Sequence, residues 1–177
     1  MKFIYFPSLL FFLATLCSCN STPKQESVKT YADLEAEFIS TLTSADTTAV
    51  LTKAESLMEG LQNGELEKSL MGLAELKGDS IIPISSQKLS EMIRHFQRFP
   101  VQKYRLTSYC FSIPELNDLK YSIEFAPANS EGYAPTISFM LNPIKVDNVW
   151  YLCVKDKEHS SKDMLHPIHP KTPITIR

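Results

Sequence analysis

The sequence is poor in the residue types that mark several protein classes. Its 177 residues include only 5 glycines and 4 cysteines, and its 11 prolines belong to no visible repeat. This composition excludes a collagen-like repeat and a disulfide-rich scaffold. Hydrophobic residues make up 44% and charged residues 21% of the chain, which also excludes a wholly disordered protein. The length predicts one domain, with room for at most a small second one.

The sequence also lacks an excess of charge of one sign. The 18 Lys and Arg residues stand against 20 Asp and Glu, so the formal net charge is -2 at pH 7. Basic residues do not gather in a patch interleaved with aromatic residues, and we expect no nucleic-acid partner. The sequence also has no Gly-rich phosphate loop and no Gly-x-Ser-x-Gly, Cys-x-x-Cys or His-Glu-x-x-His motif. No cofactor or metal is therefore expected.

Long hydrophobic runs are absent except at the start of the chain. Phe3 to Leu16 is mostly apolar and follows Lys2. As a helix, these 14 residues would span about 21 Å, which is too short for a hydrocarbon core of about 30 Å. Such a run is typical of a secretory signal.

The end of this run, Leu16-Cys17-Ser18-Cys19, resembles the lipobox of bacterial lipoproteins. The resemblance implies cleavage after a signal peptide at 1–18, acylation of Cys19, and membrane anchoring by several acyl chains. Residues 19–30 are then expected to be a flexible polar tether. The resemblance thus implies a lipid-anchored protein of the bacterial cell envelope. No acidic run follows Cys19, which argues against export to the outer surface and favours a domain that faces the periplasm. A secreted protein without the lipid is the alternative.

From residue 31 the apolar residues recur with a helical period for about seventy residues. Their stripes predict four helices, over 31–42, 46–63, 66–78 and 85–99. Asp46 and the Ser85–Ser86 pair are expected as N-caps, because their side chains can accept from the first free backbone N–H groups. Gly64 and Gly78 are expected at C-terminal ends, and Pro100 stops the last helix.

Beyond Pro100 the period changes to two, which predicts strands over 102–112, 119–125, 137–141 and 150–154. Asp147 and Asn148 tolerate positive φ and predict a two-residue hairpin turn. The segment 157–177 shows no periodicity and is expected to be a flexible tail. Helices followed by strands predict an α+β domain at 31–156, with amphipathic helices on an antiparallel sheet and Trp150 buried between them.

Two stretches resemble the NTF2-like superfamily, which has a cystatin-like α+β fold. Residues 54–76, AESLMEGLQNGELEKSLMGLAEL, are similar to its opening helices, which break at a Gly-acid turn. Residues 144–154, IKVDNVWYLCV, are similar to its closing hairpin, in which a Trp points into the cone. The resemblance implies a curved sheet around a concave pocket. That pocket serves binding or assembly as often as catalysis.

Few residues are candidates for chemistry. His95 is expected on the solvated side of its helix, and Glu124 has no partner at a recognisable spacing. Three histidines in the tail, His159, His166 and His169, could serve a zinc ion only if the tail folded back. We expect them to be solvated.

Cys110 and Cys153 remain once Cys17 is cleaved off and Cys19 is acylated. Both lie in predicted strands in an oxidising compartment, where a disulfide between them could persist. Small buried thiols without a bridge are the alternative.

The leading hypothesis is a membrane-anchored, non-catalytic module that binds a small apolar ligand or a protein partner. The alternative is an NTF2-like enzyme, of the isomerase or dehydratase type, acting on a small hydrophobic substrate. The nature of the cavity separates the two. A buried acid or base with a shifted pKa favours the enzyme, whereas an apolar or filled pocket favours binding.

Overall fold

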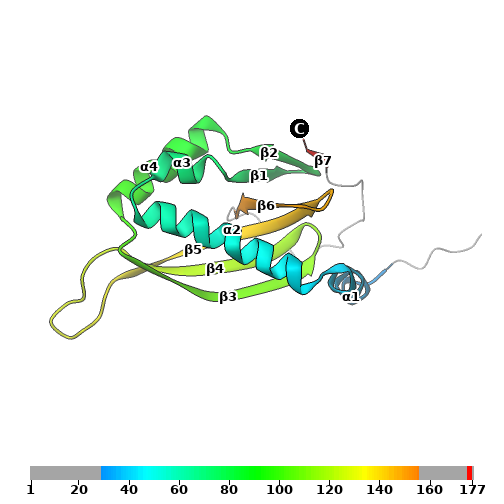
Figure 1. Cartoon of the computed structure of the whole chain (residues 1–177), viewed down its shortest axis with the longest axis horizontal. Helices are drawn as coiled ribbons and strands as arrows, with labels where there is room; N and C mark the ends of the chain where they lie inside the picture. Colours follow the sequence, from blue (N-terminus) through cyan, green and yellow to red (C-terminus); the bar gives the residue numbers. More distant parts are fainter. Residues whose placement is uncertain (1–28, 156–174, 177) are drawn as a thin grey trace, which may run out of the picture.

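The computed structural model describes residues 29–155 and 175–176. Four helices come first and largely precede the long strands (Figure 1). The elements in chain order are α1 (Tyr31–Thr41), α2 (Ser44–Gln62), α3 (Leu66–Leu70), β1 (Ala74–Lys77), β2 (Ser80–Pro83), α4 (Ser86–Arg98), β3 (Lys103–Ile113), β4 (Leu116–Glu124), β5 (Thr136–Val146), β6 (Val149–Val154) and β7 (Thr175–Ile176). The predicted α+β class is confirmed.

The helices lie on one side of a twisted sheet with the strand order β3-β4-β5-β6-β1-β2-β7. Helices α2, α3 and α4 cover the concave face, and α1 contacts β3 near one end of the sheet (Figure 1). The main core fills the space between these layers. Trp150 on β6 belongs to it and is only 6% exposed, as predicted.

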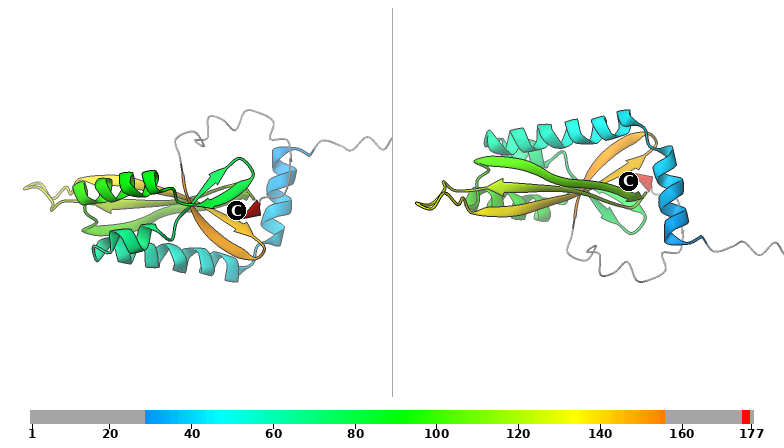
Figure 2. Two further views of the ribbon diagram at one scale, coloured as in Figure 1. Left: turned by 90° about the horizontal axis from the view of Figure 1, so that it is seen from above. Right: turned by 90° about the horizontal axis from the view of Figure 1, so that it is seen from below.

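The sheet is mixed, whereas the sequence predicted an antiparallel one. β3, β4, β5 and β6 do pair antiparallel in sequence order. β1, however, meets β6 in parallel at the single pair Ala74–Cys153, and the β1–β2 hairpin diverges from β6 beyond that point (Figure 2). A second, smaller apolar cluster joins these two hairpins. The parallel contact joins two strands that are separated in the chain by α4 and four other strands, and local periodicity cannot predict such a pairing.

The helix predicted over 66–78 is the largest correction. Only Leu66–Leu70 is helical, and Ala74–Lys77 forms β1, paired with β2. Gly78 has φ +57 and makes the turn of this hairpin instead of closing a helix. The leucines at 66, 70, 73 and 76 fit a helical spacing, but Gly72 interrupts the stripe, and the pairing with β2 decides the structure of its second half.

The termini of the longer helices follow their capping residues. Thr43, not Asp46, is the N-cap of α2, and Asp46 is the third residue of a capping box in which each side chain bonds the other residue's backbone N–H. Thr30 and Asp33 repeat this arrangement on α1, and Ser85 caps α4 as predicted. Gly64 beyond α2 has φ +80, also as predicted.

The predicted hairpin turn between β5 and β6 is confirmed, with Asp147 at φ 49 and Asn148 at φ 64. Within the segment predicted as a flexible tail, Thr175–Ile176 forms β7 and pairs in parallel with β2. Two β-branched residues are too few to show a period, although their strand propensity is high. The rest of 157–174 lies outside the described residues.

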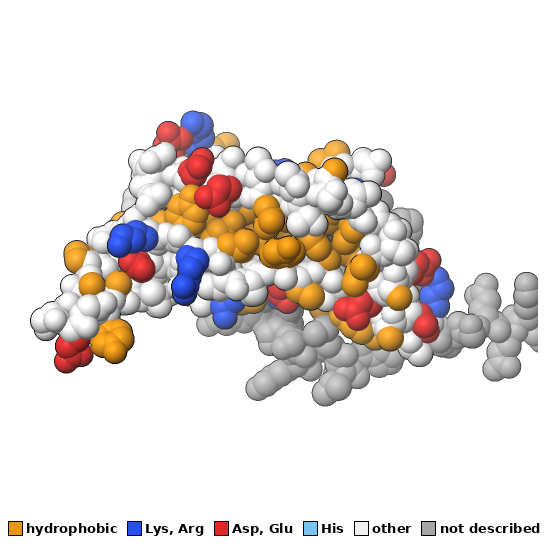
Figure 3. Space-filling view, turned by 60° about the horizontal axis from the view of Figure 1, so that its bottom comes forward, with side chains coloured by type: hydrophobic (Ala, Val, Ile, Leu, Met, Phe, Trp, Pro, Cys, Tyr) orange, Lys and Arg blue, Asp and Glu red, His pale blue; other side chains and the backbone are white. Residues whose placement is uncertain are grey.

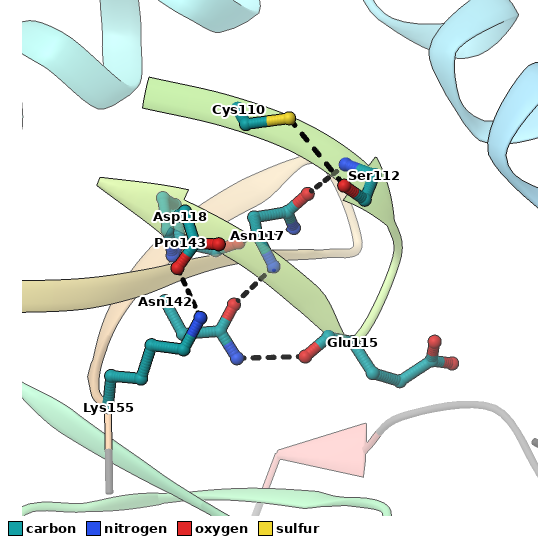
Figure 4. Close-up of polar contacts among 8 residues, drawn as sticks. All are labelled: Cys110, Ser112, Glu115, Asn117, Asp118, Asn142, Pro143 and Lys155. Carbon is teal, nitrogen blue, oxygen red and sulfur yellow. Dashed lines mark hydrogen bonds and ion pairs between the residues drawn. The ribbon is translucent and has the colours of Figure 1, made fainter. Parts of the chain in front are cut away.

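Two buried asparagines fix the β3–β4 hairpin against β5 (Figure 4). The backbone N–H of Asn117 donates to Asn142 Oδ1 at 2.8 Å, and Asn117 Nδ2 donates to the Pro143 carbonyl at 2.7 Å. Asn142 Nδ2 donates to the carbonyl of Glu115 at 2.8 Å. Because these polar groups satisfy one another, the network is structural and is not a ligand site.

Candidate functional site

An open groove between α2 and the edge of the sheet is the candidate site. It encloses about 520 Å³, within the usual range for small-molecule sites. We call it the α2–β3 groove, and its lining residues are Leu51, Thr52, Glu55, Ser56, Glu59, Leu106 and Tyr121. Figure 3 shows a band of apolar side chains across this side of the molecule, with acidic side chains on its upper border.

The groove exists because of where β3 ends the sheet. β3 is the terminal strand on this side, and its apolar residues face α2 with no further strand beside them. Tyr121 on β4 forms the floor and is buried, while Leu106 on β3 is half-buried. Leu51 on α2 closes the apolar wall from above. The apolar surface therefore comes from three elements that are far apart in sequence.

Charged groups stand only at the rim of the groove. Glu55 and Glu59, one helical turn apart on α2, are both exposed, and no ion pair joins either to a cation in the described part of the chain. The Tyr104 hydroxyl donates to Glu55 Oε1 at 2.7 Å and bridges α2 to β3. The rings of Tyr104 and Tyr121 lie 6.1 Å apart.

Burial raises the pKa of both tyrosines. It raises the pKa of Tyr121 to about 12, with a further contribution from the nearby Glu55 charge. Burial is also the main cause that raises the pKa of Tyr104 well above its usual value, and the hydrogen bond to Glu55 is the second. A phenol with the ordinary pKa of about 10 is already protonated at physiological pH, so these upward shifts do not change the protonation state of either tyrosine there.

The groove has no buried acid or base. The one acidic side chain buried in the described residues is Glu75 on β1, which accepts from the backbone N–H of Ser85 at 2.6 Å and lies 3.7 Å from Lys77. It holds the start of α4 and does not line the groove. Residues 29–155 also contain no cluster of His, Cys, Asp and Glu that could hold a metal ion.

The predicted surface position of His95 is confirmed. Its ring is exposed on α4 and packs against Phe96 and Phe99, with centroids 5.4 and 5.2 Å away. Glu124 on β4 lies 3.8 Å from Lys103 and takes no part in the groove. Cys19 and the three tail histidines lie outside the described residues.

The structure does not bring Cys110 and Cys153 together. Cys110 is exposed on β3 and Cys153 is buried on β6, and both are free thiols. β4 and β5 lie between these strands, so three strand spacings of about 4.8 Å separate them by roughly 14 Å. A disulfide needs Cα atoms within about 7 Å. The strand order, which the sequence could not supply, therefore excludes this bridge.

Sequence reasoning missed the groove residues Glu55, Glu59, Leu106 and Tyr121 as a set. One local signal was present: Lys103 and Arg105 alternate with Tyr104 and Leu106, and charged residues in this pattern are common on edge strands. An edge strand beside an amphipathic helix is a place where a groove can open. The helix that faces it could not be identified from the pattern.

Comparisons with known proteins give a likeness of fold only. No family model and no curated protein matches the chain. An NTF-2 like protein of unknown function from Shewanella oneidensis MR-1 is similar in structure, with 14% identity and a TM-score of 0.38 over 62% of this chain and 98% of that one. A proposed NTF2-like transpeptidase from Campylobacter jejuni has 13% identity and a TM-score of 0.32 over 58% and 94%.

Both similar structures are described as NTF2-like proteins. Identities of 13–14% and TM-scores below 0.5 carry no conclusion about the function of this chain. Among residues 29–155, no helix has the length and apolar character that a membrane span needs.

Proposed function

We propose that this chain is a lipid-anchored, non-catalytic binding module of the bacterial cell envelope, and that it binds an apolar ligand in the α2–β3 groove. The observation that supports binding is the make-up of the groove, which has an apolar floor and wall and carries its charges only on exposed rim residues. An enzyme of the isomerase or dehydratase type requires a positioned acid or base whose pKa is tuned by burial. None of the described residues that line the groove meets that requirement.

A neutral fluorescent probe tests the groove. N-phenyl-1-naphthylamine brightens when it enters an apolar site, so the full-length chain should give a saturable increase in fluorescence. Leu106→Gln places an amide in the wall and should weaken binding at least tenfold, because an unpaired polar group then faces the ligand. Arg105→Gln, on the opposite face of the same strand, is the matched control and should bind like the parent.

Equal binding by Leu106→Gln and the parent chain would show that the probe sits elsewhere, and the proposal for the groove would fail. Circular dichroism of both variants checks that the fold is retained.

The anchor is tested separately, because it depends on Cys19 alone. Mass spectrometry of the mature N-terminus should find Cys19 as the first residue, carrying acyl chains, and Cys19→Ala should abolish acylation. A mature chain that begins with a free Asn20, or an unmodified Cys19, would contradict the anchor without affecting the groove.

A further inference from the structure

A second hollow lies on the other side of α2, between this helix, α3 and β6. Its volume is about 330 Å³, at the lower end of the range for small-molecule sites. We call it the lysine pocket, and it is lined by Lys53, Ser56, Leu57, Gly60, Glu65, Lys68, Ser69, Gly72, Leu73 and Leu152. Its charged and polar groups differ from those of the α2–β3 groove, with which it shares only Ser56.

The pocket is preformed by a close approach of α2 to α3. A Cβ atom at Gly60 would lie 2.0 Å from Ser69 Oγ, so only glycine permits this contact without a shift. The floor is apolar, because Leu57, Leu73 and Leu152 are all buried members of the main core.

Lys53 is positioned before any ligand arrives. Its Nζ donates to the backbone carbonyl of Trp150 at 2.8 Å and lies 5.7 Å from the centre of the Tyr151 ring. An ammonium group has three donors, so two remain for a ligand. No ion pair joins Lys53 to a carboxylate in the described part of the chain.

Counted together with Lys53, the charged residues around the pocket carry one net positive charge. Lys68 lies 2.7 Å from Glu65, an exposed pair in which the lysine side chain is 81% exposed. Two lysines therefore face one glutamate around the pocket, and the hydroxyls of Ser56 and Ser69 add neutral donors. A cationic rim above an apolar floor is complementary to an anion with a short apolar chain.

We propose that the lysine pocket binds a small amphipathic carboxylate. Its carboxylate group accepts from Lys53, with Lys68 and the two serine hydroxyls nearby, and its chain lies on the leucine floor. At roughly 30 Å³ for each non-hydrogen atom, the volume of a water molecule in the liquid, the pocket holds about ten such atoms. A saturated carboxylate of eight carbons has this size.

Titration of the full-length chain with octanoate, followed by NMR of leucine methyl groups, tests the proposal. The signals of Leu57, Leu73 and Leu152 should move in a saturable manner. Octan-1-ol, which has the same chain without the charge, should bind at least tenfold more weakly. Lys53→Gln should weaken octanoate binding about tenfold, since it removes a charge-assisted hydrogen bond. Lys68→Gln should have a smaller effect in the same direction, and the control Lys103→Gln should have none.

Three results would overturn the proposal. Octan-1-ol could bind as well as octanoate, both Lys53→Gln and Lys68→Gln could bind octanoate like the parent, or the shifts could appear at Leu51 and Leu106 of the groove instead. Lys68 is exposed, so its variant keeps the fold even if Lys53→Gln disturbs β6. Leu106→Gln separates this proposal from that for the groove, because it should leave octanoate binding unchanged.

Discussion

Helix α2 is joined to the sheet by two hydrogen bonds of the same chemical kind, each from an aromatic donor to a carboxylate. In its first turn, Trp150 Nε1 donates to Asp46 Oδ1 at 3.0 Å. Further along, the Tyr104 hydroxyl donates to Glu55 Oε1 at 2.7 Å. The Asp46 side chain is 11% exposed and pairs with Lys145 at 2.5 Å, whereas Glu55 is exposed at the rim of the groove.

The surroundings give these two bonds different roles. Asp46, Lys145 and Trp150 form what we call the sealed end of α2, where Lys145, Trp150 and Thr43 all contact one partly buried carboxylate. At the groove, water can replace either partner of the Tyr104–Glu55 bond, so its loss costs little. The sealed end therefore stabilises the fold, whereas the polar groups on the groove side can exchange their partners for a ligand.

The largest effect on the free energy of unfolding is expected from a substitution of Trp150, the aromatic residue of the sealed end. Trp150→Ala removes a side chain that packs against Phe111 at 5.5 Å between ring centroids and donates to Asp46. We expect it to lower the free energy of unfolding by about 3–5 kcal/mol. Denaturant unfolding measures this loss against a total that is typically about 5–15 kcal/mol. A loss below about 1 kcal/mol would show that the sealed end does not hold the fold.

Asp46→Asn should have the next largest effect. It keeps the shape of the side chain but removes the charge that Lys145, Thr43 and Trp150 all contact. The expected loss is roughly 1.5–3 kcal/mol, the range for hydrogen bonds to a charged group. Asp33→Asn is the matched control, since Asp33 occupies the same capping-box position on α1 without a Trp or Lys145 partner. If both variants lose the same free energy of unfolding, the contacts of Asp46 with Lys145 and Trp150 add no stability beyond that of helix capping.

The contacts of the Asp46 carboxylate also predict that the free energy of unfolding falls at acid pH. The hydrogen bond with Lys145 is the main cause that holds the pKa of Asp46 well below its usual value, followed by those with Thr43 and Trp150. A lowered folded-state pKa stabilises the protein above the unfolded value of about 3.9, and this contribution is lost as the pH falls toward the lowered pKa. Denaturant unfolding between pH 6 and 3 should therefore show a smaller acid loss in Asp46→Asn than in the parent.

The sequence predicts the fold correctly for those elements whose structure depends on local interactions alone. The apolar arc of α2, the alternation along β4 and the turn at Asp147 and Asn148 each report local backbone geometry. The segment 66–78 was predicted wrongly because its second half is decided by pairing between β1 and β2. The strand order that separates Cys110 from Cys153 is likewise a property of the whole chain.

The candidate site was less predictable than the fold, for the same reason. Leu51 and Leu106 lie in segments that the sequence predicts as an amphipathic helix and a strand, yet apolar positions in a sequence do not show which of them the folded core leaves exposed. The groove is open because β3 is the last strand on its side of the sheet. Only the assembled sheet shows this.

A substitution on the groove side of α2 should have only a small effect on the free energy of unfolding. Tyr104→Phe removes the hydroxyl that bonds Glu55 but keeps the ring against Tyr121. We expect a loss of about 0.5–1 kcal/mol, because Glu55 is exposed and gains water in exchange. Denaturant unfolding measures it, and a loss as large as that of Asp46→Asn would mean that both ends of α2 are sealed.

The smallest effect is expected on α4, away from both regions of α2. His95 is exposed and lines neither the α2–β3 groove nor the lysine pocket. His95→Ala should change the free energy of unfolding by less than about 0.5 kcal/mol and leave probe binding unchanged. Phe96→Ala, one residue away, is the control: Phe96 is buried against Phe139 at 5.4 Å, and its truncation should cost about 3–5 kcal/mol. A loss of probe binding in His95→Ala, with the fold intact, would bring the enzyme hypothesis forward, because the one histidine in residues 29–155 would then act on the ligand.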